Sequence, residues 1–198
     1  MSGSPAKIAT AYLLTCAAIG VATGLLIIPA TAFSTLTYAV LPPVSALVGG
    51  AWIVGFVIAM RLLERPGAAL LTGLISGLVA TPFSATGPAI IVTNVMFAAF
   101  VELPFLVVLY RRWYRWLFVA GAVLVTALYT VWTATAANMA SFPGWVLALY
   151  VVALFASNVG AAALGILIAD QLRRAGVARL ARRRDLPAPA ASSAPPAV

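Results

Sequence analysis

Long apolar runs separated by short joints constrain this chain more than any other feature of its sequence. A helix needs about 20 apolar residues to cross the ~30 Å hydrocarbon layer of a membrane. Six candidate runs occur at residues 8–28, 38–63, 66–81, 89–110, 116–137 and 145–172, of which the third is short. Only 8% of the residues are charged, whereas soluble domains carry roughly a quarter. The sequence therefore predicts an all-α membrane protein, a bundle of six transmembrane helices.

The charged residues are concentrated on one side of the predicted bundle. Most lie before the first run or in the joints after the second, fourth and sixth runs: Lys7; Arg61, Glu64 and Arg65; Arg111, Arg112 and Arg115; and Asp170, Arg173, Arg174, Arg179, Arg182, Arg183, Arg184 and Asp185. The other three joints, near residues 29–37, 82–88 and 138–144, carry no charge. Because basic loops remain in the cytoplasm, this pattern predicts that both termini are cytoplasmic. The net charge of +8 then reflects topology and not nucleic-acid binding.

The chain divides into a membrane domain, residues 1–172, and a tail, residues 173–198. The tail is basic at first and then rich in alanine and proline, so we expect it to be cytoplasmic and disordered. Ala30-Thr31-Ala32 is similar to a signal-peptide cleavage motif. However, the apolar run before it exceeds the about 7–15 residues of a signal-peptide core. We therefore expect the first run to remain as a membrane span.

The residue types that are missing exclude several kinds of chemistry. The sequence has no histidine and a single cysteine, Cys16, which argues against metal sites and excludes disulfides within the chain. It also lacks the GxxxxGK[ST] phosphate loop, so any ATP hydrolysis would have to come from a partner. We predict that the chain is not an enzyme and holds neither a metal nor a cofactor.

Polar side chains inside the apolar runs are the candidate functional residues. Glu102, the only acid well inside a run, lies near the middle of the fourth. A carboxylate is costly inside the membrane, so it should have a specific role there. Glu102 is either a ligand contact or a proton-binding site, or it is a structural group that holds helices together. Asn94 is eight residues earlier and about 80° away around the helix, so both side chains could face one cavity.

Three runs carry a stripe of polar residues along one helical face. The stripes are Thr126, Tyr129, Thr130 and Thr133 in the fifth run, with Trp132 beside them; Tyr38, Ser45 and Trp52 in the second; and Tyr150, Ser157 and Asn158 in the sixth. Any single stripe is more typical of hydrogen bonding between helices. Their coincidence, mostly in the outer halves of the runs, favours a pocket that opens outward.

Small residues at GxxxG spacing mark faces where helices approach closely. Gly20 and Gly24 form this motif in the first run, and Gly73 and Gly77 form it in the third. Packing within the bundle explains most such motifs in a chain rich in glycine and alanine. For Gly20 and Gly24 the alternative is a surface that docks another membrane subunit.

Short segments from the third run to the start of the fifth carry a family resemblance. They read RPGAALL at residues 65–71, AFVELPF at 99–105 and YRRW at 110–113. With six spans and no ATPase motif, the chain resembles the substrate-binding S components of energy-coupling factor (ECF) transporters. More specifically, it resembles the YkoE-type family, which is associated with uptake of thiamine or its hydroxymethylpyrimidine precursor.

The resemblance implies a binding subunit of the bacterial inner membrane that catalyses no reaction of its own. A transmembrane coupling subunit and two ATP-binding subunits would drive release of the ligand, and Gly20 and Gly24 would dock the coupling subunit. A pyrimidine ring could then stack on aromatic side chains, pair with polar ones and place its amino group, or a thiazolium charge, near an acid. The residues for these three roles are Trp52, Tyr129 and Trp132; Asn94, Thr133 and Asn158; and Glu102.

Two other functions remain open from the residues alone. The chain could be a self-sufficient secondary carrier with Glu102 as its proton site, although a single deep acid and the lack of an internal repeat disfavour this. It could also be an accessory or scaffold protein of the membrane that binds no ligand.

Overall fold

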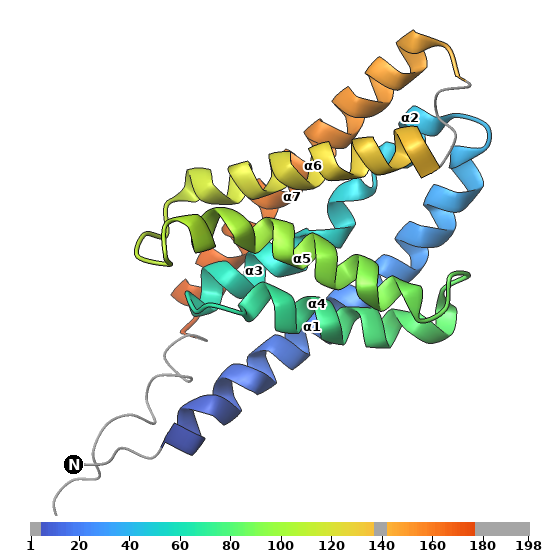
Figure 1. The fold of residues 1–198 in the computed structure, drawn as a ribbon. Helices are drawn as coiled ribbons and strands as arrows, with labels where there is room; N and C mark the ends of the chain where they lie inside the picture. The colour runs from blue at the N-terminus through green and yellow to red at the C-terminus, as the bar shows by residue number, and fades with distance from the viewer. Residues whose placement is uncertain (1–4, 137–141, 177–198) are drawn as a thin grey trace, which may run out of the picture.

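The computed structural model describes residues 5–136 and 142–176, with side chains from residue 10 onward. In these ranges the regular structure is entirely helical (Figure 1). The elements are α1 (Pro5–Tyr38), α2 (Pro42–Ala46), η1 (Gly49–Trp52), α3 (Val54–Leu63), α4 (Ala68–Ala80), η2 (Thr81–Phe83), α5 (Ala89–Val107), α6 (Arg115–Ala136) and α7 (Gly144–Arg174). The predicted tail after residue 176 and residues 137–141 of the last joint lie outside the described ranges.

Five segments of the described chain are long and apolar enough to cross a membrane. They are Thr10–Tyr38, Pro42–Leu63, Ala89–Val107, Arg115–Thr135 and Gly144–Arg174. A sixth apolar segment, Ala68–Phe83, is shorter and corresponds to α4 followed by η2. The predicted all-helical membrane fold is confirmed, with one of the six apolar runs below the usual length of a crossing.

Helix α1 is longer than the sequence predicted. We expected Pro29 to lie in a joint after residue 28, but α1 continues through it to Tyr38. Proline lacks the N–H that would bond to the carbonyl four residues earlier, yet it is tolerated in membrane helices when neighbouring groups compensate. At 1.5 Å per residue, α1 is about 50 Å long, more than a bilayer core requires.

The second predicted span is not one continuous helix. Pro42 and Pro43 start the short helix α2, the 3₁₀ turn η1 follows, and only α3 is regular over ten residues. The 3₁₀ segment lies against α7, where Ser157 bonds once to the end of α2 and once to η1. The Ser157 hydroxyl donates to the carbonyl of Leu47 at 2.6 Å and accepts the N–H of Gly50 at 2.9 Å.

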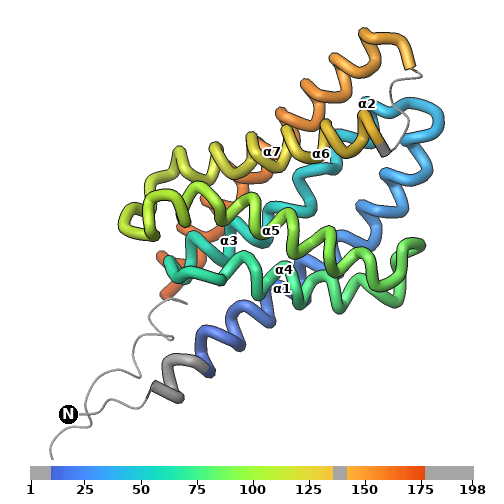
Figure 2. Tube along the Cα trace, viewed as in Figure 1, coloured from blue at the N-terminus to red at the C-terminus, as the bar shows by residue number. Residues whose placement is uncertain are grey.

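Helix α4 packs between α1 and α5, and both interfaces use the GxxxG glycines (Figure 2). A methyl group at Gly20 would lie 2.8 Å from Cβ of Ile75, and one at Gly24 would lie 2.8 Å from Cβ of Val79. Gly20 and Gly24, which we expected to dock a partner subunit, are therefore buried against α4 inside the chain. Their close approach is needed for the fold itself.

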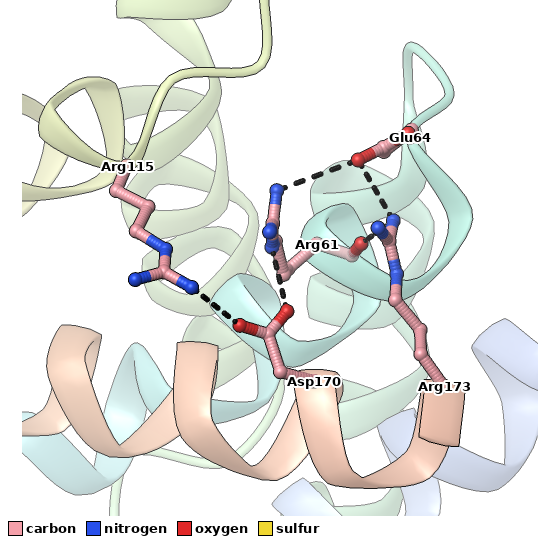
Figure 3. A network of polar contacts seen from close by, with 5 residues as sticks. All are labelled: Arg61, Glu64, Arg115, Asp170 and Arg173. Atoms are coloured by element: carbon pink, nitrogen blue, oxygen red, sulfur yellow. Dashed lines mark hydrogen bonds and ion pairs between the residues drawn. The ribbon is translucent and has the colours of Figure 1, made fainter. Parts of the chain in front are cut away.

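Charged residues tie three helices together at one end of the bundle (Figure 3). Arg61 of α3 and Arg115 of α6 bond to the two carboxylate oxygens of Asp170 on α7, at 3.1 and 3.0 Å. Glu64 forms ion pairs with Arg61 at 3.5 Å and with Arg173 at 2.8 Å. This end lies at the left of Figure 1, where α3 meets α4 and α5 meets α6.

Asp170→Asn should weaken this end of the bundle. The side chains of Arg61 and Asp170 are only 15% and 21% exposed, so their bond is screened less than a surface pair. Loss of hydrogen bonds between charged groups costs about 2 kcal/mol. We expect a lower midpoint of thermal unfolding in detergent for this variant. Arg112→Gln is the matched control and should leave the midpoint unchanged, since the Arg112 side chain is exposed and, within residues 10–135 and 142–176, bonds only to Tyr114.

Candidate functional site

A cavity of about 330 Å³ lies at the opposite end of the bundle from the ion pairs. The second half of α1, α2, η1, the α4–α5 joint, α5, the end of α6 and the start of α7 form its walls. Its polar and aromatic lining residues are Thr31, Ser34, Thr35, Ser45, Trp52, Ser84, Thr86, Thr93, Phe97, Tyr129, Trp132, Tyr150 and Asn158. None of the lining residues is Asp, Glu, Lys or Arg, so the cavity is polar in places but carries no formal charge.

Aromatic rings at the cavity form two groups of ring contacts. Tyr129 and Trp132 stack with their ring centres 5.5 Å apart and an interplanar angle of 29°. Phe97 meets Tyr129 edge-on at 5.6 Å, and Tyr150 meets Tyr38 edge-on at 6.5 Å. Trp132 remains 50% exposed, so a flat ligand can reach its ring. Such a wall suits an aromatic guest, because offset and edge-to-face ring contacts add to simple burial.

The hydroxyl groups in the helical walls present mainly hydrogen-bond acceptors to the cavity. The side chains of Thr31, Thr35, Ser45 and Thr93 each donate their one hydrogen to a backbone carbonyl in the same helix, at 2.7–3.2 Å. A hydroxyl has one donor and two acceptor positions. With the hydrogen used internally, what each side chain can offer a ligand is an oxygen lone pair.

Four of the seven predicted ligand residues line the cavity: Trp52, Tyr129, Trp132 and Asn158. Asn94 and Thr133 do not, although both are buried. Asn94 lies between α5 and α4, where its amide donates to the carbonyl of Ile90 at 2.9 Å and its oxygen lies 3.5 Å from the hydroxyl of Ser76. Thr133 donates to the carbonyls of its own helix at Tyr129 and Thr130.

Glu102 lies far from the cavity, near the charged end of α5. Its carboxylate accepts hydrogen bonds from the backbone N–H of Gly67, the N–H of Leu70 at 3.4 Å and the hydroxyl of Tyr110 at 2.9 Å. The expectation that Glu102 and Asn94 share one cavity is therefore wrong. A carboxylate at the start of α4 satisfies free N–H groups and interacts favourably with the helix dipole. Burial, and then the bond to Glu102, raises the pKa of Tyr110 above its ordinary value.

The sequence reasoning missed the part of the cavity that α1 provides. Thr31, Ser34 and Thr35 line the cavity, but we placed them in a joint because of Pro29. With Tyr38 they follow the spacing i, i+3, i+4, i+7, which is one face of a helix. That periodicity could have identified both the extra turns of α1 and its polar face.

Comparison with known proteins adds evidence from sequence and from shape. Residues 12–128 match the protein family described as "ABC-type cobalt transport system, permease component". The fold is similar to that of a crystal structure of an S-component of an ECF transporter, with a TM-score of 0.76 and 20% sequence identity. That alignment covers 92% of this chain and 95% of the other. No curated protein matches the sequence.

Proposed function

The chain belongs to the family of ABC-type cobalt transport system permease components, and from this we propose that it is the substrate-binding S component of an ECF-type importer. Its ligand is a small aromatic vitamin or vitamin precursor, with hydroxymethylpyrimidine first and thiamine second. The observation that carries this proposal is the uncharged cavity of about 330 Å³ with its aromatic wall, in a chain with an S-component-like fold. Cavities of small-molecule sites begin at about 300 Å³.

The distribution of charge supports an orientation in the bacterial inner membrane. The end with Arg61, Arg115 and Arg173 faces the cytoplasm with both termini, as basic segments do. The cavity then opens to the outside, where an importer first meets its ligand. The third predicted joint, at residues 82–88, contributes Ser84 and Thr86 to this outer mouth.

An organic molecule fits the cavity better than a cobalt ion does. Cobalt prefers imidazole, thiolate and carboxylate ligands, and the lining residues include none of these groups. Among the described residues, no cluster of three or more His, Cys, Asp or Glu side chains could hold a metal. We therefore propose that this cavity binds a neutral ring and not the cobalt ion in the family's description.

The position of Glu102 favours the neutral precursor over thiamine. A thiazolium cation would gain most from a carboxylate nearby, but Glu102 is bonded to Gly67 and Tyr110 at the other end of the bundle. The cavity offers a cation aromatic faces such as Trp132 and neutral oxygens, but no carboxylate. Because Glu102 lies away from the cavity, it also gives no support to a proton-coupled carrier in which Glu102 is the proton site. Energy for uptake would come from a coupling subunit and ATP-binding subunits.

Titration of the purified protein in detergent with hydroxymethylpyrimidine and thiamine tests this function. Trp52 and Trp132 line the cavity, so binding should quench tryptophan fluorescence. We expect both compounds to bind and hydroxymethylpyrimidine to bind more tightly. Folded protein that binds neither compound, or that binds Co²⁺ instead, would overturn the assignment.

Trp132→Ala should weaken binding of hydroxymethylpyrimidine by roughly tenfold or more, because stacking of a base on an aromatic ring contributes about 1–3 kcal/mol. Binding is measured by calorimetry, since the variant also removes a fluorophore. Trp116→Ala is the matched control: Trp116 is on the same helix and 60% exposed, but it does not line the cavity. Equal affinity in the two variants would exclude Trp132 from the site.

A further inference from the structure

The side-chain amide of Asn158 is held in one orientation in the wall of the cavity. Its Nδ2 donates a hydrogen bond to Oγ1 of Thr126 at 2.9 Å, across the interface between α7 and α6. The Thr126 hydroxyl in turn donates to the carbonyl of Ala122 at 2.8 Å. Both side chains are almost completely buried, with 1% of Asn158 and 5% of Thr126 exposed.

The Thr126 hydroxyl determines which end of the Asn158 amide faces it. A hydroxyl has a single hydrogen, and that of Thr126 is used by Ala122. Only lone pairs remain on its oxygen, so the neighbouring group must be the NH₂ of Asn158. Rotating the amide by 180° would bring two acceptor oxygens together. The carbonyl oxygen, Oδ1, is therefore the end of the amide that does not bond to Thr126.

Oδ1 of Asn158 is buried and has no hydrogen-bond partner among the described residues. Asn158 lines the cavity together with Gly49 and Leu154. A methyl group added at Gly49 would lie 3.9 Å from Oδ1 of Asn158 and only 2.5 Å from Cδ1 of Leu154, so the Leu154 side chain fills the space beside Gly49. A buried acceptor without a partner is destabilising, because it has lost its bonds to water and gained none in return. A ligand that supplies a donor there would restore the missing hydrogen bond.

We propose that Oδ1 of Asn158 accepts a hydrogen bond from an N–H group of the ligand, and that Thr126 is the positioning residue that fixes this preference. The proposal rests on the function assigned to the cavity and makes it more specific. The ligand class becomes neutral aromatic rings that carry an amino or ring N–H donor. Threonine and serine oxygens in the other walls, such as those of Thr31 and Ser45, favour donors in the same way.

A pair of ligands of equal shape tests the proposal. The probes are hydroxymethylpyrimidine, which has a 4-amino group, and its 4-methyl analogue, which has no donor at that position. We expect the protein to bind the amino compound about tenfold more tightly, the usual size of one buried hydrogen bond. Asn158→Leu should reduce this ratio to about one, because the affinity for the amino compound falls while that for the methyl compound is retained.

Thr126→Val tests the positioning role without touching the ligand contact. Valine has the shape of threonine but no oxygen, so the Asn158 amide is free to turn its NH₂ toward the ligand. The preference for the amino compound should fall severalfold in this variant. Thr130→Val is the matched control, since Thr130 is one turn along α6, does not line the cavity, and its Oγ1 has no partner. It should keep the full preference.

The outcomes separate this proposal from the one on which it rests. If the unmodified protein binds both probes equally, or if Asn158→Leu keeps the preference, the role of Asn158 is refuted while the cavity remains a ligand site. If neither probe nor thiamine binds to folded protein, both proposals fail. Should Asn158→Leu not fold, the ratio in Thr126→Val decides alone, and an unchanged ratio there refutes the proposal.

Discussion

Glu102→Ala should lower the free energy of unfolding by about 3 kcal/mol, because it leaves buried donors without their acceptor. The Glu102 side chain is 3% exposed and accepts hydrogen bonds from three donors, which would all lose their partner at once. Two of the donors are N–H groups at the start of α4, where no other side chain caps the helix. The third is the hydroxyl of Tyr110.

The bond to Tyr110 increases the expected effect because the turn between α5 and α6 is strained. Leu109 and Tyr110 have φ angles of +53° and +55°, a left-handed conformation that is uncommon outside glycine. The turn needs support from contacts such as the one between Tyr110 and Glu102. We therefore expect Glu102→Ala to loosen the start of α4 and this turn together, which hydrogen exchange of the backbone amides would detect.

Glu102→Gln separates this structural role from a direct role in transport. Glutamine places an NH₂ near donors, which still costs stability. It keeps one acceptor oxygen, however, so we expect a smaller loss of stability than in Glu102→Ala. Affinity for hydroxymethylpyrimidine should be unchanged in the glutamine variant, since Glu102 does not line the cavity. A glutamine variant of normal thermal stability that no longer binds or transports would show that Glu102 acts in transport and would contradict the structural reading.

The membrane fold was predictable because hydrocarbon imposes simple length and charge rules. Apolar runs had to be helical, and their charged joints had to meet at one end, as Arg61, Arg115 and Asp170 do. The exact bounds of α1 were not predictable from Pro29, because a membrane helix can continue through proline when neighbours satisfy the backbone. The break after Tyr38 came instead from Pro42 and Pro43.

Helical periodicity predicted only part of the candidate site. Of the polar stripe on α6, Tyr129 lines the cavity, as does Trp132 beside it, but Thr126, Thr130 and Thr133 do not. Glu102 could not be placed in the same way, since its depth depends on where α5 ends. Helix α5 stops at Val107, three residues before the apolar run does, which brings Glu102 within reach of Gly67 and Tyr110. Asn94 faces α4 because Gly73 allows a close approach there.

Gly24→Leu should disrupt the protein and not merely its contacts with a partner. A Cβ atom at Gly24 would lie 2.8 Å from Cβ of Val79 and 2.9 Å from the carbonyl oxygen of Ser76, too close for any side chain. Leucine would force α1 away from α4, at a cost of about 3 kcal/mol or more. Because the outer half of α1 lines the cavity through Thr31 and Thr35, ligand binding should fall as well.

Gly160→Leu is the matched control for this substitution. It places the same side chain in another long apolar helix, α7, but a Cβ atom at Gly160 meets nothing within 4 Å. We expect its thermal midpoint and its affinity for hydroxymethylpyrimidine to equal those of the unmodified protein. The measurements are thermal unfolding in detergent, ligand titration and co-purification with the coupling subunit. A Gly24→Leu protein that stays stable and binds ligand, yet fails to co-purify, would instead make Gly24 part of a docking surface.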